Sequence, residues 1–535
     1  MKSSGTFCLF GLVGLMLLAT TVPAALNLPN IFNDNMVLQR EIPVPIWGWA
    51  EPGDKITVKF GSQEKSAIAG DDGRWDVKLD PMPACGKGQC MMIVNGEEAR
   101  RIDNILVGEV WVCAGQSNME WCVDALENGL VQASLARFPE IRFIDAPNDI
   151  SGVPLRDFQA KWKVCHPTTI GSFSAVGYFF GRELFEHLQI PIGLIGSNWG
   201  ATQIEPWTPA FALSGNEELR NAGKYINRAN TAYQQTLREK LSEIDTWRKN
   251  VDKAIAAGKP LPAFDIFIPH ELHSNSHPTA IYNAMVAPFA TFAIRGVIWY
   301  QGENNIKDGI KYAPKMKALI AGWRKAWNEG DFPFLFCQIA PFYYGNAPEE
   351  TLPALWEAQY QVLATVPNTG MASTVDIGNP RNIHPLDKRD VGDRLARIAL
   401  AKTYKMKNVT YLNPSFKSMQ TFENKIIITF ANVGKELKTR DGLAPREFEL
   451  AGPDGKFYSA EAVIMDNEIV LSCSMVKNPI SVKYAWRNIA NPNLINEEDL
   501  PVLPFKVISS GRQQPEGKVV PGGTTTVTGR LEPSK

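Results

Sequence analysis

A serine stands between two polar amides in the segment "WVCAGQSNMEWC", residues 111–122. Ser117 follows an apolar run typical of a buried strand and stands where a helix would begin. A serine hydroxyl becomes a strong nucleophile only when a base takes its proton, and the oxygen that turns negative on the attacked carbonyl needs fixed donors. An ordinary helix N-cap also fits this position, so a catalytic role depends on partners elsewhere in the chain.

Candidate partners follow other apolar runs. Gly200, Asn304 and Asp376 each come shortly after such a run, and His384 precedes a helical pattern. Ligands of an open parallel α/β sheet bind beyond the carboxyl ends of its strands, so we expect these residues to meet at one edge. The backbone N–H groups of Ser117 and Gly200 and the side-chain amide of Asn304 could form an oxyanion hole. His384 is the best-placed base among the six histidines.

The elements that must position these residues lie between residues 105 and 404. Apolar runs at 109–115, 191–197, 296–302, 332–340 and 371–378 alternate with helical patterns at 176–188, 312–328, 352–366 and 387–404. This alternation predicts an α/β domain whose mostly parallel sheet is covered by helices on both faces. The charged, helix-forming segment 209–278 is too long for a simple crossover. It predicts a helical insertion, which either covers the site or decorates the domain far from it.

Two regions of β pattern flank this domain. Residues 26–104 contain short β runs such as "VPIWGWA" and "KITVKF", separated by turn residues, and predict an N-terminal β-sandwich. Similar runs return in residues 405–510 and predict a second, C-terminal β-sandwich region. Residues 511–535 are rich in Gly, Pro and Thr and predict a flexible tail.

The first 25 residues have the layout of a secretory signal peptide. One lysine is followed by an apolar stretch from Phe7 to Leu18 and by small residues up to Ala24 and Ala25, where cleavage is expected. The mature protein is therefore predicted to be secreted or periplasmic. Seven of the eight cysteines remain after cleavage, and an odd number leaves at least one thiol free.

The charge balance narrows the range of partners. Lys and Arg number 55 against 56 Asp and Glu, and the basic residues are scattered. No basic field argues for nucleic acid or anionic lipid, and no later apolar run is long enough to enter a membrane. The expected ligand is small or neutral. No residue spacing resembles a metal site, so neither metal nor cofactor is predicted, and the oligomeric state stays open.

Four segments carry a family resemblance. "GQSNMEW", "WGATQIEPW", "GVIWYQGENN" and "IHPLDKRDVGDRLA" resemble, in this order, the sequence blocks of the sialate O-acetylesterase-like branch of the SGNH (GDSL-type) hydrolases. The resemblance covers roughly residues 106–404 and extends to 484–505. It implies an SGNH, flavodoxin-like fold, a serine esterase mechanism without metal, and O-acetylated carbohydrate as substrate. By position it implies Ser117 as nucleophile, His384 as base, and Gly200 and Asn304 in the oxyanion hole.

The chain departs from the SGNH pattern at one position. Many SGNH enzymes have an aspartate three residues before the histidine, where it orients the imidazole, but Arg381 stands there in this chain. Asp376 is the nearest upstream carboxylate and the candidate acid. Alternatively, a backbone carbonyl could hold the ring of His384 in a Ser-His dyad.

Substrate contacts are predicted for four further residues, namely Gln116, Gln301, Glu303 and Trp207. Gln301 and Glu303 could equally bind substrate hydroxyls or fix neighbouring loops. Trp207 could stack on a sugar ring or belong to the core.

These patterns together predict a secreted carbohydrate O-acetylesterase that works through an acetyl-serine intermediate. Its substrate would be an acetylated mono-, oligo- or polysaccharide, either sialic acid or a plant polysaccharide such as xylan. One alternative is a non-catalytic carbohydrate-binding protein on the same scaffold. Another is a lipid esterase, which would need a wide apolar groove that the sequence does not indicate.

Overall fold

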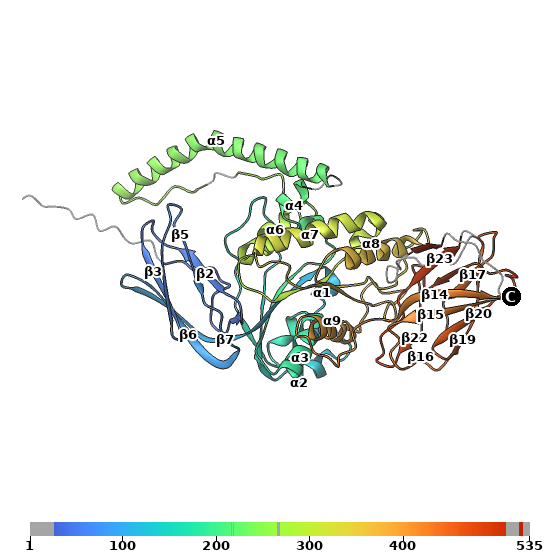
Figure 1. Cartoon of the computed structure of the whole chain (residues 1–535). Coiled ribbons are helices and arrows are strands. Elements are labelled where there is room, and N and C mark those ends of the chain that lie inside the picture. Colours follow the sequence, from blue (N-terminus) through green and yellow to red (C-terminus); the bar gives the residue numbers. More distant parts are fainter. Residues whose placement is uncertain (1–25, 216, 218, 265–267, 510–523, 528–535) are drawn as a thin grey trace, which may run out of the picture.

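Three regions follow one another in the computed structural model, which describes residues 26–215, 217, 219–264, 268–509 and 524–527. Figure 1 shows an N-terminal β region, a central α/β region and a C-terminal β region side by side, with the long helix α5 above the first two. The predicted signal peptide lies outside the described residues.

The N-terminal region consists of strands that pair antiparallel, except that the first one pairs parallel with the last. They are β1 (Val37–Gln39), β2 (Val44–Trp49), β3 (Lys55–Phe60), β4 (Gln63–Ile68), β5 (Arg74–Leu79), β6 (Cys85–Asn95) and the first part of β7 (Glu98–Gly115). β2 pairs with β5, while β3 pairs with β4 and β6 in a second sheet. Buried and exposed side chains alternate along β3 and β5, as expected for strands that pack one face on a core.

Strand β7 belongs to two sheets. It pairs antiparallel with β6 over its first part and parallel with β10 and β11 over its last part. Its residues are buried from Ile105 to Gly115, where it runs through the middle of the central sheet. The predicted boundary between residues 104 and 105 therefore falls inside one continuous strand.

The central sheet has the strand order β13-β12-β11-β7-β10-β8-β9. Its strands besides β7 are β8 (Phe138–Asp145), β9 (Lys163–Cys165), β10 (Ile192–Asn198), β11 (Gly296–Tyr300), β12 (Phe334–Cys337) and β13 (Thr369–Ala372). In this order, all neighbouring strands from β13 to β8 pair parallel. The edge strand β9 pairs antiparallel with β8, so the sheet is mixed. Four of the five predicted strands correspond to β7, β10, β11 and β12, and the fifth, predicted at 371–378, overlaps β13 only at residues 371–372. The sequence reasoning missed β8, because Arg142 and Asp145 interrupt its apolar pattern.

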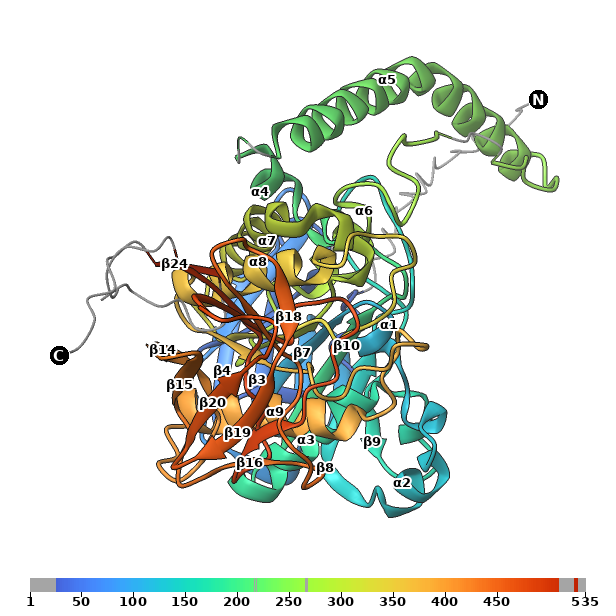
Figure 2. The same ribbon diagram turned by 90° about the vertical axis from the view of Figure 1, so that its right-hand side faces the viewer.

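Helices cover both faces of this sheet. The α-helices in the described part of the chain are α1 (Ser117–Glu120), α2 (Gly129–Leu135), α3 (Ala175–Leu188), α4 (Ala210–Ser214), α5 (Arg220–Ala256), α6 (Ala280–Met285), α7 (Tyr312–Trp327), α8 (Thr351–Thr365) and α9 (Lys388–Lys402). Short 3₁₀ helices are η1 (Val123–Ala125), η2 (Ile170–Ser172), η3 (Glu205–Trp207), η4 (Ala287–Phe289) and η5 (Glu303–Lys311). α3 and α9 pack together on one face, and α7 and α8 lie on the other (Figures 1 and 2). The four predicted helices agree closely with α3, α7, α8 and α9.

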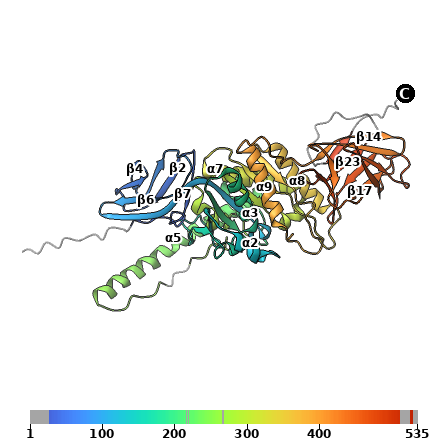
Figure 3. The same cartoon turned by 90° about the horizontal axis from the view of Figure 1, so that it is seen from below.

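The predicted insertion is helical. Its long helix α5 buries only Gly223, Ile226 and Ala229, all near its first residues. Ile226 and Ala229 pack with Leu213 of α4 in a small separate cluster. Beyond them α5 extends away from the body (Figures 1 and 3).

The C-terminal region is a second set of β-sheets. Its strands are β14 (Ser415–Phe422), β15 (Lys425–Ala431), β16 (Leu437–Thr439), β17 (Phe448–Ala451), β18 (Phe457–Ser459), β19 (Glu461–Met465), β20 (Glu468–Ser472), β21 (Ser481–Tyr484), β22 (Leu494–Asn496), β23 (Phe505–Ser509) and β24 (Thr524–Val527). The two larger sheets have the orders β14-β15-β20-β19 and β18-β17-β21-β23-β24. β24 lies within residues 511–535, for which a flexible tail was predicted. The rest of that tail lies outside the described residues.

Two further features bear on the sequence predictions. In the described part of the chain, no helix is long and apolar enough to cross a membrane. The seven described cysteines, Cys85, Cys90, Cys113, Cys122, Cys165, Cys337 and Cys473, are all free thiols.

Candidate active site

The turn that presents Ser117 is built by Gly115, the last residue of β7. Gly115 has a φ of 146°, and a Cβ there would lie 2.1 Å from the carbonyl oxygen of Tyr300 on β11. Only glycine lets the two strands approach this closely before the chain turns into α1. The buried side chain of Gln116 then fixes the turn, because its Oε1 accepts hydrogen bonds from the backbone N–H groups of Gly302 (3.2 Å) and Asn304 (3.4 Å).

His384 reaches the serine from the loop before α9. Its Nε2 lies 2.9 Å from Ser117 Oγ, a hydrogen-bonding distance for a nucleophile and its base. The backbone N–H of His384 donates to Asn382 Oδ1 at 2.9 Å. Its ring stacks on Trp121, with centroids 4.9 Å apart and planes at 29°. Burial and the nearby charge of Lys388 lower the pKa of His384 below its usual 6.5, which favours the neutral ring that can accept a proton.

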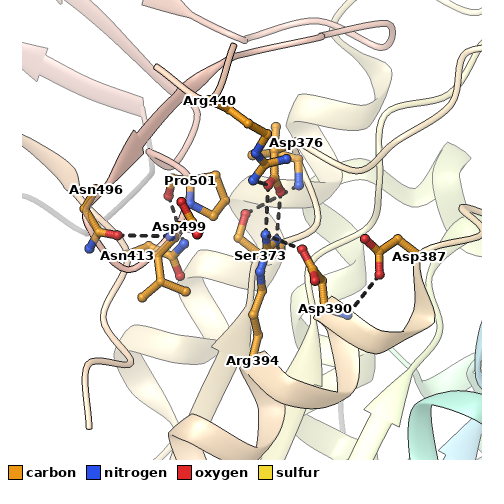
Figure 4. Close-up of polar contacts among 12 residues, drawn as sticks. Ser373, Asp376, Asp387, Asp390, Arg394, Asn413, Arg440, Asn496, Asp499 and Pro501 are labelled. Carbon is orange, nitrogen blue, oxygen red and sulfur yellow. Dashed lines mark hydrogen bonds and ion pairs between the residues drawn. The ribbon is translucent and has the colours of Figure 1, made fainter. Parts of the chain in front are cut away.

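Asp376 lies at the expected edge of the sheet but does not contact His384. Its two carboxylate oxygens accept hydrogen bonds of 2.7 and 2.8 Å from Arg394 of α9. Arg440, from the C-terminal β region, also binds it (Figure 4). Burial raises the pKa of Asp376, but the two guanidinium groups outweigh burial and hold that pKa below 3.8. The prediction that Asp376 orients His384 is wrong for this structure, because its carboxylate is committed to two arginines.

No other carboxylate takes over this role in the described part of the chain. The His384 ring has one hydrogen bond there, to Ser117. Arg381, at the position where SGNH enzymes often have an aspartate, is exposed. The serine and histidine therefore form a dyad rather than a triad in this geometry.

The three predicted oxyanion donors lie close together. A Cβ on Gly200 would stand 3.3 Å from Ser117 Cβ, which places the Gly200 backbone beside the nucleophile. The side-chain amide of Asn304, which is exposed, donates to the carbonyl of Ala201 at 2.8 Å. The N–H of Gly200 donates a hydrogen bond to Glu120 Oε2 at 2.7 Å. Glu120 must therefore move before Gly200 can donate to an oxyanion.

Four residues predicted to bind substrate are buried. The exposed fractions are 3% for Gln116, 1% for Gln301, 5% for Glu303 and 0% for Trp207. Gln301 Nε2 donates to the carbonyl of Thr202, and Trp207 Nε1 donates to the hydroxyl of the same threonine. The prediction of direct substrate contact is therefore wrong for these side chains. They fix the loops that carry the site, which is the alternative the sequence left open for Gln301 and Glu303.

Comparisons with known proteins identify similar esterases. The family described as "Carbohydrate esterase, sialic acid-specific acetylesterase" matches residues 270–401, a range that includes Asn304 and His384. The sialate O-acetylesterase of Rattus norvegicus is 29% identical over 455 residues, which cover 76% of this chain and 80% of the relative. The human sialate O-acetylesterase is 28% identical and covers 74% of each chain.

A solved structure decides the relationship. The crystal structure of a carbohydrate acetylesterase from Xanthomonas citri is 32% identical, covers 90% of this chain and 99% of that chain, and has a TM-score of 0.75. The chain belongs to the sialate O-acetylesterase-like family of carbohydrate esterases. It is therefore an esterase, and an acetylated carbohydrate is the substrate class that fits the family.

Two residues near the dyad of this esterase, Glu120 and Lys388, escaped the sequence reasoning, and Asn118 was recognised only as a position after the strand, without a role. Asn118 and Glu120 stand in the same block as the nucleophile, where polar residues at a helix start have ordinary capping roles. Lys388 had a detectable pattern, because it shares the helical face of Val391 and Leu395 at i, i+3 and i+7. A lysine in that apolar register is expected to be buried, and its exposed fraction is 1%.

The site offers no cluster suited to a metal ion. Across the described ranges, no group of three or more His, Cys, Asp or Glu residues could hold one.

Proposed function

We propose that this esterase removes O-acetyl groups from carbohydrates through an acetyl-serine intermediate. The observation that carries the proposal is the 2.9 Å contact between Ser117 Oγ and His384 Nε2 at the carboxyl edge of the sheet. Strand order and helix placement support an SGNH-type, flavodoxin-like arrangement of the central domain. The N-terminal 25 residues support export, to the periplasm or out of the cell.

The reaction has two halves. Ser117 Oγ attacks the acetyl carbonyl carbon while its proton passes to His384 Nε2, and the oxyanion is held by N–H groups of Ser117, Gly200 and Asn304. The bond between the acetyl carbon and the sugar oxygen then breaks, and His384 returns the proton to that oxygen. Water attacks the acetyl-serine with His384 again as base, which releases acetate and restores the serine.

The substrate is proposed to be an acetylated sugar, with O-acetyl sialic acid and acetylated xylan as the two classes to compare. The curated relatives carry the name sialate O-acetylesterase, which favours the first. The related crystal structure carries the broader name carbohydrate acetylesterase, which keeps the second open.

Acetate release tests the proposal. We expect the wild-type protein to release acetate from p-nitrophenyl acetate and from at least one of O-acetyl sialic acid and acetylated xylo-oligosaccharides. Ser117→Ala and His384→Ala should lose this activity while remaining folded. His187→Ala is the matched control, because His187 is a half-exposed histidine on α3, and it should behave as wild type. A wild-type protein that binds sugars but releases no acetate would instead support the non-catalytic alternative.

A further inference from the structure

The residue after the nucleophile links the two halves of the dyad. Asn118 has no exposed surface, and its side chain makes three hydrogen bonds. Nδ2 donates to Glu303 Oε1 and, at 3.1 Å, to the backbone carbonyl of Ile383, while Oδ1 accepts from Lys388 Nζ. Ile383 directly precedes His384. Asn118 therefore ties the helix that carries Ser117 to the loop that carries the base.

Lys388 is the charged member of this network. Its ammonium group is buried at the start of α9 and lies 5.9 Å from the ring centroid of Trp121 and 5.7 Å from that of Tyr300. Within the described residues, Asn118 Oδ1 is its one side-chain acceptor. Burying an ammonium group is costly, so an apolar residue would serve packing alone better. Because Trp121 also stacks on His384, the lysine and the base contact the same indole ring.

We propose that Lys388 and Asn118 are positioning residues for the deacetylation reaction, which hold His384 against Ser117 where other serine hydrolases use a carboxylate. This inference rests on the proposed function. A carboxylate in a triad holds the imidazole and stabilises its protonated form. Here the hydrogen-bond chain from Lys388 through Asn118 to Ile383 holds the loop, and a cation near the ring favours its unprotonated form instead.

The charged groups around Lys388 determine the pH range in which its positive charge acts on His384. Burial lowers the pKa of Lys388 to about 7, against the opposing effects of Glu303 on η5, Cys337 on β12 and Asp387 before α9. Lys388 is therefore charged at the acidic pH where His384 would gain its proton. Since a neighbouring positive charge disfavours imidazolium, wild-type His384 stays a competent base at lower pH than an isolated histidine would.

The variant Lys388→Met tests the inference, because it keeps the apolar stem and removes both the charge and the hydrogen bond. The rate kcat/KM for p-nitrophenyl acetate is measured from pH 5 to 9. We expect the acidic limb of the profile to move to higher pH and the plateau to fall roughly tenfold or more, as a displaced base would cause. Arg389→Met is the matched control. It removes a positive charge from the neighbouring residue of α9, whose side chain is 59% exposed, and its profile should overlay that of wild type.

A folded Lys388→Met protein with the wild-type profile and plateau would overturn the inference. If that variant does not fold, the pKa of His384 is measured in the wild-type protein by NMR titration of ¹³C-labelled histidine. The signal of His384 is assigned by comparison with His384→Gln. A His384 pKa at or above 6.5 would overturn the inference. Ser117→Ala separates the two proposals. Full activity in that variant refutes the proposed function, whereas a dead Ser117→Ala beside a normal Lys388→Met refutes only the role of Lys388.

Discussion

Replacing Asp376 with asparagine should destabilise the protein without disabling its chemistry. The Asp376 side chain is 1% exposed, and its partner Arg394 is 6% exposed. Breaking a buried ion pair by removing one partner costs about 3–5 kcal/mol, because the remaining charge is left uncompensated. Arg394 keeps a 2.7 Å hydrogen bond to the Ser373 carbonyl and a 3.4 Å contact with Asp390, so we expect a loss near the low end, about 3 kcal/mol.

In contrast to its stability, the turnover of the Asp376→Asn protein should change little. Asp376 makes no hydrogen bond to His384 among the described residues, so kcat per folded molecule should stay close to the wild-type value. Loss of an orienting acid in a Ser-His-Asp triad costs about 10⁴-fold in kcat. A structural ion pair and an orienting acid therefore predict values of kcat for Asp376→Asn that differ by orders of magnitude.

The pH dependence of stability gives a second check. The arginines hold the pKa of Asp376 below 3.8, so its ionised form stabilises the fold. Such a group contributes stability above its unfolded pKa of about 3.9, and this contribution disappears as the pH falls through its folded pKa. The difference in stability between wild type and Asp376→Asn should thus be full at neutral pH and shrink only below about pH 4.

The assay must separate folding from catalysis. A chain with several regions does not unfold in two states, so thermal midpoints and unfolding rates at a fixed temperature are compared instead of an extrapolated free energy. Turnover is normalised to active serines counted with a fluorophosphonate. Asp390→Asn is the control, because Asp390 meets the same arginine but is 42% exposed, and it should cost at most about 1 kcal/mol. A well-folded Asp376→Asn protein of normal stability whose kcat has collapsed would refute this reasoning.

Three other outcomes are expected from the same site. Asn304→Ala should lower kcat by roughly a hundredfold or more with little change in thermal midpoint, because an oxyanion donor is lost, and unchanged turnover would remove Asn304 from the oxyanion hole. Trp121→Leu should lower kcat up to about tenfold, since the stacked contact with His384 contributes about 0.5–1.5 kcal/mol, and a shift in KM alone would point to substrate binding instead. Treatment with EDTA should leave acetate release unchanged because the serine mechanism needs no ion, whereas a loss that zinc or calcium restores would contradict the mechanism.

The dyad was predictable because it depends on topology more than on side-chain detail. Residues that follow parallel strands gather at one edge, and the apolar runs before Ser117 and Asn304 identify those strands without ambiguity. Ser117 and His384 meet there although 267 positions separate them. The same argument placed Asp376 at this edge, but it says nothing about the direction of a side chain.

Contacts between separate regions could not be predicted from the sequence. Arg440, which helps to hold Asp376, lies 64 residues further along the chain in a different β region. No local period or motif connects the two. The burial of Trp207 and Gln301 likewise depends on how loops from separate strands pack together, as in the shared contact with Thr202. Strand β8 was hidden for another reason, because its buried Arg142 resembles a surface residue in the sequence.

The double membership of β7 constrains how this protein can be shortened or recombined with its relatives. The strand has 18 residues, enough to span roughly 60 Å, and its last residue precedes the nucleophile by only two positions. A cut between residues 104 and 105 would remove the first 7 of the 18 residues of this strand, and with them most of its pairing to β6. A chimera that exchanges the N-terminal β region would have to replace the strand leading to Ser117 as well. The N-terminal β region is thus joined to Ser117 by one continuous strand and is not an accessory that can be exchanged by itself.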